Sequence, residues 1–207
     1  MNPDQDDLKK LCDRQEKLRF LASHVGTRIL LSTQLGIPYD QVRIGIGHFG
    51  KKYCINSSEL HFNISHSGDY VVLAFSRYSV GVDVERICSN HYYPEVLKLL
   101  SERTQQSYKE SDDKLLTFFK IWTGLESFTK LEGIGLTGAI NSFSIIPNKK
   151  YDICTISSLG NQLIGTYIYL NEKYLICVCQ KENELFKMQE KTLSEITECI
   201  SSCQIDG

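Results

Sequence analysis

The chain has 207 residues and carries 23 basic against 25 acidic side chains, so its formal net charge is −2. Hydrophobic residues make up 42% of the sequence and charged residues 23%, which is typical of a globular protein. These values exclude wholesale disorder, a collagen-like repeat and a coiled coil. The near-neutral charge argues against a general nucleic-acid binder, but it leaves room for one local phosphate site.

The sequence predicts a soluble protein of the cytoplasm. Its N-terminal residues are polar and acidic, so no signal peptide is expected, and no apolar run is long enough to span a membrane. The cysteines, at positions 12, 54, 88, 154, 177, 179, 199 and 203, form neither a Cys-x-x-Cys pair nor a set with zinc-ligand spacing. We therefore expect reduced and mostly buried thiols.

The first part of the chain is expected to form a helix and several strands. The predicted elements are a helix over 8–35, a strand at 42–46, a glycine-containing turn over 45–52, and strands at 61–65, 70–75 and 80–87. Gly36 ends the helix, whose apolar residues recur at three- and four-residue spacing. The strand at 70–75 is continuously apolar, which predicts that it is buried.

The second part repeats this order. The predicted elements are helices over 94–108 and 112–131, strands at 141–146, 151–157, 162–169 and 174–179, and a last amphipathic helix over 183–202. The repetition predicts an α+β chain made of two similar α/β halves in a pseudo-two-fold arrangement. We place the N-terminal half at residues 1–90 and the C-terminal half at 91–207, within one compact unit.

Two acidic residues stand on one face of the strand at 80–87. In a strand, residues two apart point to the same side, so Asp83 and Glu85 project together while the alternating valines enter the core. Gly81 on the same face is expected to leave open space beside them. Two carboxylates this close favour a cation such as Mg²⁺ or Mn²⁺. A solvent-exposed strand face would explain the same pattern.

Glu126 falls at the margin of an apolar stripe on the helix over 112–131, beside Phe119 and Trp122. A carboxylate in that position is partly withdrawn from water and needs a partner. Lys130, one turn further along, could form a simple surface ion pair with it. Gly124 in the same helix is tolerated most easily where close packing or a ligand needs the space.

The strand at 61–65 leads into a polar turn. Alternation places Phe62 and Ile64 on one face of this strand and the polar side chains His61, Asn63 and Ser65 on the other. The following residues, His66, Ser67 and Gly68, add an imidazole, a hydroxyl and open backbone N–H groups, which together form a plausible anion cradle. A plain turn in which His66 satisfies a carbonyl fits equally well, and Lys51 and Lys52 before it could be merely solvated.

Read together, three blocks resemble the phosphopantetheinyl transferases of the surfactin-synthetase-activating type. The blocks are the segment GKKYC with the hairpin HFNISHSGDYVVLAF, the strand VGVDVERI and the helix FFKIWTGLESFTKLEGIGL. They occur in the family's order, together cover about residues 50–135, and are followed by a matching segment Phe143-Ser144-Ile145. The resemblance implies the fold of that family, with the active site at the junction of the two halves.

The resemblance also implies an activity. The protein would transfer 4′-phosphopantetheine from coenzyme A to a serine of an acyl or peptidyl carrier protein and release 3′,5′-ADP, with Mg²⁺ (or Mn²⁺) as cofactor. We expect a monomer that acts on neither nucleic acid nor a membrane. The carrier protein would dock through its acidic helix beside the segment after Gly135, from Leu136 to Phe143.

The resemblance gives individual residues a role in this reaction. Asp83, Glu85 and Glu126 would hold the metal ion, and the catalytic residues would be Asp83, Glu126 and Lys130. The residues that bind coenzyme A would be Arg19 near the 3′-phosphate, Lys51 at the nucleotide end, Ser65 and His66 at the phosphates, and Lys130. Glu126 would accept the serine proton, directly or through water, while Lys130 stabilises the departing phosphate.

Two departures from the family pattern stand out. Leu125 occupies the position where the family usually has lysine, immediately before the helix glutamate. This removes a phosphate-facing cation, so either Lys120, Lys130 or another lysine replaces it or turnover is reduced. The N-terminus also lacks a clear first strand, so the family's lysines from that region are not assigned among Lys9, Lys10, Arg14 and Lys17.

Two other functions are compatible with the sequence. The first is a binding module that keeps the coenzyme A pocket and carrier surface without catalysis, which the Leu125 departure favours. The second is a metal-dependent pyrophosphohydrolase, which would release 3′,5′-ADP without an acceptor protein.

Overall fold

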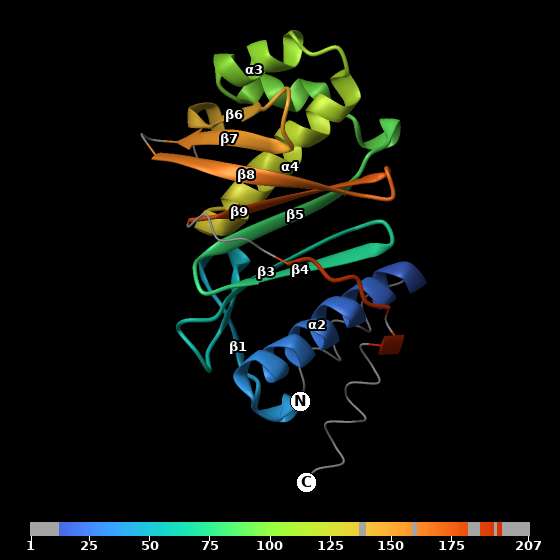
Figure 1. Ribbon diagram of the computed structural model, residues 1–207, viewed down its shortest axis with the longest axis vertical. Coiled ribbons are helices and arrows are strands. Elements are labelled where there is room, and N and C mark those ends of the chain that lie inside the picture. Colours follow the sequence, from blue (N-terminus) through green and yellow to red (C-terminus); the bar gives the residue numbers. More distant parts are fainter. Residues whose placement is uncertain (1–12, 137–139, 159–160, 182–186, 193, 196–207) are drawn as a thin grey trace.

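The computed structural model describes residues 13–136, 140–158, 161–181, 187–192 and 194–195 (Figure 1). Its helices are α2 (Arg14–Leu35), α3 (Glu102–Lys109) and α4 (Lys114–Glu132). Its strands are β1 (Ile44–Ile46), β2 (Lys52–Cys54), β3 (His61–Ser67), β4 (Tyr70–Ser76), β5 (Val80–Arg86), β6 (Ser144–Pro147), β7 (Ile153–Ser158), β8 (Asn161–Leu170) and β9 (Tyr174–Gln180). Figure 1 shows α3 at one end of the long axis and α2 at the other.

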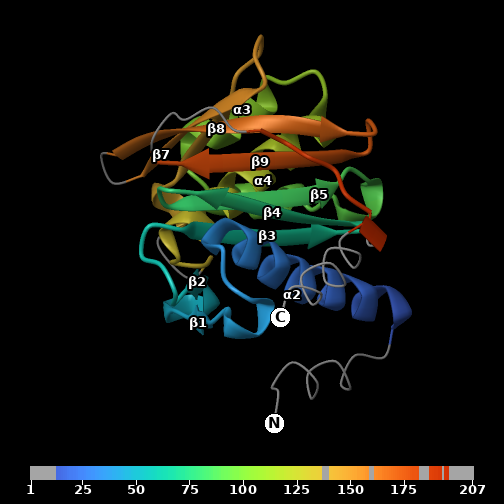
Figure 2. The same cartoon turned by 60° about the horizontal axis from the view of Figure 1, so that its bottom comes forward.

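The strands form three antiparallel sheets. β1 pairs with β2 and β3 pairs with β4, while the largest sheet has the order β5-β9-β8-β7-β6. β5 therefore belongs to the sheet of the C-terminal strands, in register from Val80 opposite Gln180 to Arg86 opposite Tyr174. The β3–β4 hairpin lies beside β5, between the large sheet and α2 (Figure 2). The predicted α+β class is confirmed, whereas the division at residue 90 and the pseudo-two-fold symmetry stay predictions.

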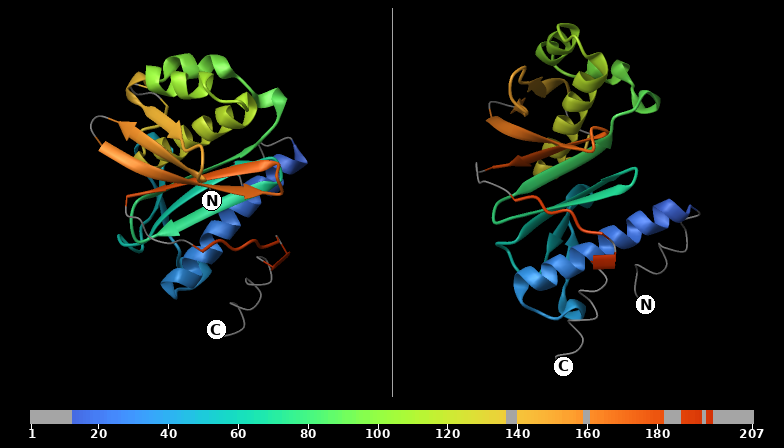
Figure 3. Two further views of the ribbon diagram at one scale, coloured as in Figure 1. Left: turned by 45° about the horizontal axis from the view of Figure 1, so that its top comes forward. Right: turned by 45° about the vertical axis from the view of Figure 1, so that its right-hand side comes forward.

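Helix α4 packs across one face of the five-stranded sheet and closes the main core (Figure 3). Asp113 caps the N-terminus of the helix, because its carboxylate accepts the N–H of Leu116 at 2.9 Å. Its predicted apolar stripe is confirmed, because Phe118, Phe119 and Leu125 are all buried in the core. The core between α4 and the sheet consists of Leu97, Leu100, Phe118, Phe119, Ile121, Leu125, Phe128, Leu131, Phe143, Ile145, Cys154, Ile156, Tyr167, Leu175, Cys177 and Cys179.

The closest approach of α4 to the sheet is at Gly81 on β5. A Cβ atom at this position would lie 2.0 Å from the carbonyl oxygen of Ser127 and 2.5 Å from the backbone nitrogen of Leu131. The expectation of open space beside Asp83 is therefore wrong, because the helix backbone fills it. Glycine at this position lets the helix that carries Glu126 lie directly on the strand that carries Asp83.

Helix α2 buries small and polar residues as well as two apolar ones, Ile29 and Leu31. Asp13 caps its N-terminus, and Gly36, in the left-handed conformation with φ 63°, ends it as predicted. The buried face contains Ser23, Gly26 and Thr27, whereas Leu18 is 42% exposed. The apolar spacing thus predicted the helix correctly, but only part of the predicted apolar stripe is buried: Ile29 is buried, whereas Leu18 and Leu21 are exposed. Residues 8–12 of the predicted helix lie outside the described residues.

The β3–β4 hairpin is joined to β5 by side chains instead of a backbone ladder. Every second residue of β3 accepts a backbone N–H of β5: Asn63 from Val82 at 2.9 Å, Ser65 from Val84 at 3.3 Å and Ser67 from Arg86 at 3.0 Å. The polar face predicted for this strand therefore connects the two parts of the molecule. The alternation has a structural purpose that the sequence did not reveal.

Several predicted boundaries need correction. The helix expected over 94–108 is a 3₁₀ segment, Pro94–Leu99, followed by α3, which starts anew at Glu102 because the Ser101 hydroxyl accepts the N–H of Thr104 and caps it. The strand expected from 42 begins at Ile44, and the strand expected from 141 begins at Ser144, after a short 3₁₀ turn. β4 is partly rather than fully buried. Of the helix expected over 183–202, residues 187–192 have no regular structure, and 183–186, 193 and 196–202 lie outside the described residues.

The cysteines in the described part of the chain are free thiols, as predicted. Cys54, Cys154, Cys177 and Cys179 are buried and Cys88 is partly buried, whereas positions 12, 199 and 203 lie outside the described residues. No helix among the described residues is long and apolar enough to cross a membrane.

Candidate active site

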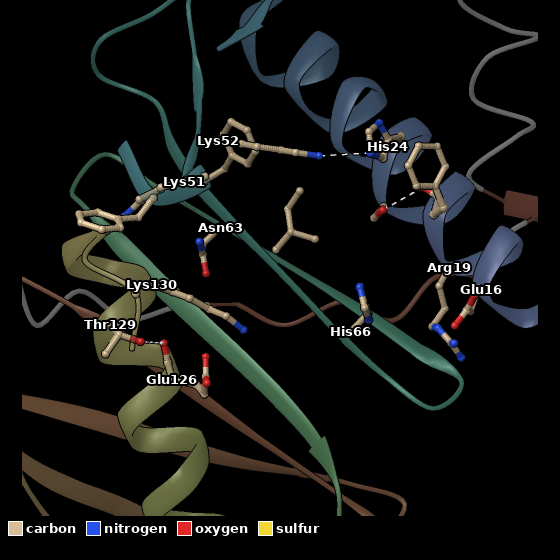
Figure 4. Close-up of a pocket in the computed structure, with 18 residues that line it drawn as sticks. Glu16, Arg19, His24, Lys51, Lys52, Asn63, His66, Glu126, Thr129 and Lys130 are labelled. Carbon is tan, nitrogen blue, oxygen red and sulfur yellow. Dashed lines mark hydrogen bonds between the residues drawn. The ribbon is translucent and has the colours of Figure 1, made fainter. Parts of the chain in front are cut away.

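A cavity of about 650 Å³ lies where α2, the β2–β3 region and α4 meet (Figure 4). This volume falls within the usual range for small-molecule sites. Five of the residues predicted to bind or react line it: Arg19, Lys51, His66, Glu126 and Lys130. They come from four separate segments of the chain, so the fold brings together what the sequence keeps apart.

Asp83 lies behind the cavity wall, at the contact between β5 and α4. The side chain is only 3% exposed, and its Oδ1 accepts hydrogen bonds from Lys130 Nζ at 2.6 Å and Ser65 Oγ at 2.8 Å. Its other oxygen, Oδ2, is buried and has no hydrogen-bond partner among the described residues. Burial is the main cause that raises the pKa of Asp83, and Lys130 opposes the rise. A buried carboxylate oxygen left without a donor favours a cation nearby.

Ser65 is part of this buried network and does not line the cavity. Besides its bonds to Val84 and Asp83, its Oγ accepts a hydrogen bond from Lys130 Nζ at 3.1 Å. The structure thus gives Ser65 three protein partners at the junction. Its predicted contact with a coenzyme A phosphate stays a prediction.

The charge of Asp83 affects the pKa values of both Glu126 and Glu85. Burial is the largest cause that raises the pKa of each glutamate, and the charge of Asp83 adds to it. Glu85 also adds to the rise at Glu126, whereas Lys130 lowers both pKa values. The three carboxylates are therefore close enough for their charges to act on one another, and the charge of Lys130 opposes the rise in the pKa of both glutamates.

The three carboxylates fit a divalent cation in charge and in donor type. Oxygen ligands suit Mg²⁺ and Mn²⁺, and the unpartnered Oδ2 of Asp83 supplies a position that a cation would satisfy. The ammonium of Lys130 is the positive charge that contacts Oδ1 of Asp83. Among the described residues, no group of three or more His, Cys, Asp or Glu side chains is already gathered closely enough to hold a metal ion.

Glu85 faces a second, smaller cavity of about 190 Å³ on the other side of the carboxylates. Its Oε2 accepts a hydrogen bond from Ser67 Oγ at 3.0 Å, so β3 holds both acidic side chains of β5. The smaller cavity is mainly apolar and is lined by His91, Tyr93, Val96, Phe118, Phe119 and Trp122 in addition to Glu85.

His66 and Arg19 lie on the side of the main cavity formed by β3 and α2. Partial burial, followed by the charges of Arg19 and Lys130, lowers the pKa of His66 below 6.5. This environment therefore disfavours the charged form of His66. One nitrogen of Arg19 donates to the carbonyl of Gly68 at 2.9 Å, which fixes the guanidinium beside the hairpin turn.

Lys51 forms hydrogen bonds within the protein, which the sequence did not indicate. Its Nζ donates to the carbonyl oxygens of Leu131 at 2.7 Å and Val80 at 3.4 Å, so it ties the last turn of α4 to β5. Burial is the main cause that lowers the pKa of Lys51. Its side chain still lines the cavity, and its predicted contact with the nucleotide stays a prediction.

Sequence reasoning missed two residues of the cavity wall, Lys52 and His24. Lys52 Nζ lies 3.2 Å from His24 Nε2, and both residues line the cavity (Figure 4). Lys52 was visible as the second lysine of a pair. Nothing in the helix pattern distinguished His24, because it does not belong to the apolar stripe.

Leu125, the position at which this chain departs from the family pattern, points into the core. It is 1% exposed and belongs to the apolar cluster under α4. The effect of this departure on the phosphate site and on turnover stays a prediction. Lys120 faces Asp152 at 3.9 Å and the rings of Tyr167 and Tyr169.

The segment expected to receive a carrier protein is described only in part. Leu136 is partly buried, and Phe143 is buried against Phe128 in the core, so Phe143 is not available for docking. Residues 137–139 lie outside the described residues.

The comparisons with known proteins agree with this geometry. A family model described as 4′-phosphopantetheinyl transferase, N-terminal, matches residues 2–77, and a model of the 4′-phosphopantetheinyl transferase superfamily matches residues 79–179. The two matches follow one another and together cover both sides of the cavity. The chain belongs to the 4′-phosphopantetheinyl transferase superfamily, as the three sequence blocks predicted.

Individual relatives support the same assignment. The 4′-phosphopantetheinyl transferase Sfp of Bacillus subtilis is 30% identical over 140 residues, which is 66% of this chain and 62% of that protein. A putative 4′-phosphopantetheinyl transferase of Synechocystis is 27% identical over 197 residues, 88% of this chain and 79% of that protein. The mouse L-aminoadipate-semialdehyde dehydrogenase-phosphopantetheinyl transferase is 30% identical over 131 residues, 56% of this chain and 42% of that protein. The match to Sfp thus spans about three fifths of its length.

Proposed function

We propose that this protein transfers 4′-phosphopantetheine from coenzyme A to a serine of an acyl or peptidyl carrier protein and releases 3′,5′-ADP. The observation that carries the proposal is the ion pair between the buried Asp83 and the partly exposed Lys130, which lines a cavity with basic walls together with Glu126. Attack on a pyrophosphate needs a base for the serine, positive charge at the leaving phosphate and neutralisation of the phosphate oxygens. Membership of the transferase superfamily supports the same reaction.

Glu126 is the base in this proposal. The carrier serine oxygen forms a bond to the phosphorus that bears pantetheine, its proton passes to Glu126 directly or through water, and the bond to the departing 3′,5′-ADP breaks. A raised pKa makes Glu126 a stronger base than an ordinary exposed glutamate, and partial burial keeps it close to the cavity. Lys130 faces the same space and would stabilise the charge on the departing phosphate.

Asp83, Glu85 and Glu126 would hold a divalent cation, Mg²⁺ or Mn²⁺. When bound, such an ion neutralises charge on the pyrophosphate oxygens. The unpartnered Oδ2 of Asp83 and the pKa values of Glu85 and Glu126, which burial and the charge of Asp83 both raise, support this ligand set.

The remaining basic residues would bind coenzyme A. Arg19 and Lys51 reach the cavity from opposite walls and would contact the nucleotide part, while His66, with Ser65 behind it, would contact the phosphates. We further propose that the protein acts as a monomer in the cytoplasm, because one chain supplies every element of the cavity and its substrates are soluble. The cavity gives no reason to include nucleic acid or a membrane among its partners.

The proposal is tested by incubating the full chain with coenzyme A, Mg²⁺ and a panel of apo carrier proteins, followed by intact-mass measurement. We expect at least one carrier to gain the mass of one phosphopantetheine group, and Glu126→Gln to prevent the gain. No gain on any carrier, while a control transferase modifies all of them, would contradict the proposal. Tight coenzyme A binding without transfer would indicate a binding module, and 3′,5′-ADP release without a carrier would indicate a pyrophosphohydrolase.

A further inference from the structure

Ser67, the last residue of β3, contacts two neighbouring residues of β5. Its Oγ accepts the backbone N–H of Arg86 at 3.0 Å and donates to Oε2 of Glu85, also at 3.0 Å. A hydroxyl has one proton to donate, and the bond from Arg86 holds the oxygen in place. The contact that joins the hairpin to β5 therefore also directs the proton of Ser67 at the carboxylate of Glu85.

The same pattern occurs one step earlier on both strands. Ser65 Oγ accepts the N–H of Val84 at 3.3 Å and donates to Oδ1 of Asp83 at 2.8 Å. In both cases the serine binds the carboxylate of one β5 residue and the backbone of the next. Because the pattern repeats at both acidic positions, the hydroxyls of β3 fix the direction in which the two carboxylates of β5 leave the strand.

Glu85 lacks the ion pair that holds Asp83. Asp83 binds Lys130 at 2.6 Å, whereas the ion pairs among the described residues include none to Glu85. Burial and then the charge of Asp83 raise the pKa of Glu85, and the second of these causes is repulsion between two carboxylates. Hydrogen bonds with Ser67 and with Trp122 on α4 lower this pKa and so favour the charged form. The smaller cavity beside Glu85 would otherwise give its side chain room to turn away from Asp83.

We propose that Ser67 is a positioning residue that holds the carboxylate of Glu85 beside Asp83, where it binds the divalent cation. The inference rests on the proposed function and deepens it, because it names the group that orients one of the three metal ligands. A carboxylate has lone pairs for several partners, so Glu85 can bind Ser67 and a cation together. A ligand that is already ordered binds an ion more tightly, because a flexible side chain need not be fixed at that moment.

A metal titration without a carrier protein tests the inference in the full chain. Calorimetry with Mn²⁺, in the presence of coenzyme A, measures cation affinity and needs no transfer. We expect Ser67→Ala to weaken Mn²⁺ binding about tenfold and Ser67→Thr, which keeps the hydroxyl, to stay within about threefold of wild type. Ser76→Ala is the matched control, because the hydroxyl of Ser76 at the end of β4 also accepts a backbone N–H, that of Tyr78 at 3.0 Å. Its Mn²⁺ affinity should be unchanged.

A double-mutant cycle with Glu85→Ala separates positioning from support of the hairpin. If Ser67 acts through Glu85, Ser67→Ala should have no further effect on Mn²⁺ affinity in the Glu85→Ala chain. The decrease in Tm from the lost contact with Arg86 should persist in that chain, since it does not involve the carboxylate. 

Two results would overturn the role of Ser67: an unchanged Mn²⁺ affinity in Ser67→Ala, or a tenfold loss that persists without Glu85. Absence of Mn²⁺ binding in wild type would overturn it together with the proposed metal ligands. Absence of transfer to any carrier, with the coupling between Ser67 and Glu85 intact, would instead contradict only the proposed function.

Discussion

On the side of α4 and the five-stranded sheet, sixteen described residues form one apolar cluster, whereas the cluster between α2 and β1–β4 has four: Leu31, Val42, Cys54 and Phe62. On the side with the smaller apolar cluster, buried polar side chains add to the packing. Ser23 and Thr27 on α2 and Asn63 on β3 are all buried, and Ser23 and Asn63 also line the cavity. The large core provides a rigid platform, and the lightly packed side provides most of the walls of the binding site.

The two sides of the molecule hold their parts of the site by different interactions. Glu126 and Lys130 project from a helix whose opposite face is packed in the main core, so their positions depend on apolar burial. Asp83 sits on a strand that the helix backbone touches at Gly81. The opposite wall, with Arg19, His24 and Lys52, depends on polar contacts that a ligand can strengthen. We therefore expect mutations on the two sides to separate catalysis and stability from ligand affinity.

The largest expected effect is on catalysis. Glu126→Gln and Asp83→Ala should each lower the transfer rate by about 10³-fold or more, because the first removes the base and both remove an anionic carboxylate from the cation. Folding should be largely intact, because the charged form of each of these partly or fully buried carboxylates is costly. Single-turnover transfer measured by intact mass checks this.

A matched control tests whether the loss of any carboxylate on α4 would slow transfer. Glu132→Gln removes a carboxylate at the end of the same helix that pairs with Lys181 at 3.5 Å and does not line the cavity. Its transfer rate should stay within about twofold of wild type. Wild-type rates in Asp83→Ala would contradict the metal assignment. Glu85→Ala should be milder than Asp83→Ala, since water can replace a ligand that borders a cavity.

The two cores should respond differently to the same substitution. Phe119→Ala, in the main core, should lower the free energy of unfolding by about 3–5 kcal/mol and leave KM for coenzyme A unchanged in the folded protein. Phe62→Ala, in the small core and at the cavity wall, should cost less and raise KM. Urea unfolding and steady-state kinetics on both variants measure this. Equal effects on KM would show that the two sides are not separable.

Restoring the family's lysine tests the orientation of residue 125. Because Leu125 is buried in the main core, Leu125→Lys should lower the free energy of unfolding by about 2–4 kcal/mol and should not increase the transfer rate. Leu125→Met, which conserves volume, should cost less than about 1.5 kcal/mol. A faster enzyme with unchanged stability would mean that the side chain at 125 reaches the phosphates.

The smallest expected effect is on the pH dependence of stability. A carboxyl whose pKa is raised in the folded state binds more protons there than in the unfolded state, so it favours folding at low pH. For Glu126 this contribution is full below its ordinary value of 4.5 and is lost as pH rises through the raised pKa. Glu126→Gln should therefore raise Tm relative to wild type at pH 7.5 but not at pH 4, by roughly a few degrees. An unchanged difference across this range would contradict the burial of that carboxylate.

The α+β class and the acidic residues of the site could be predicted from the sequence. The contacts that hold these residues in place could not. Periodicity predicted α2 and α4, and the family resemblance connected Asp83, Glu85 and Glu126. Neither could show that Gly81 is filled by the helix backbone, because that contact joins residues far apart in the chain.

The polar face of β3 was visible as alternation, yet its hydrogen bonds to β5 depend on tertiary placement. His24 was missed for a related reason. Helix α2 buries small residues, such as Gly26 and Thr27, so apolar spacing gave no indication of which face meets the cavity.

The proposed reaction requires Asp83 and its neighbouring glutamates to bind a cation that holds the pyrophosphate of coenzyme A. Calorimetric titration of coenzyme A with and without Mg²⁺, on wild type and Asp83→Asn, tests it most directly. We predict that Mg²⁺ tightens binding at least about tenfold in wild type and has little effect in the variant. Equal affinity with and without Mg²⁺ in wild type, or an undiminished Mg²⁺ effect in Asp83→Asn, would contradict the account.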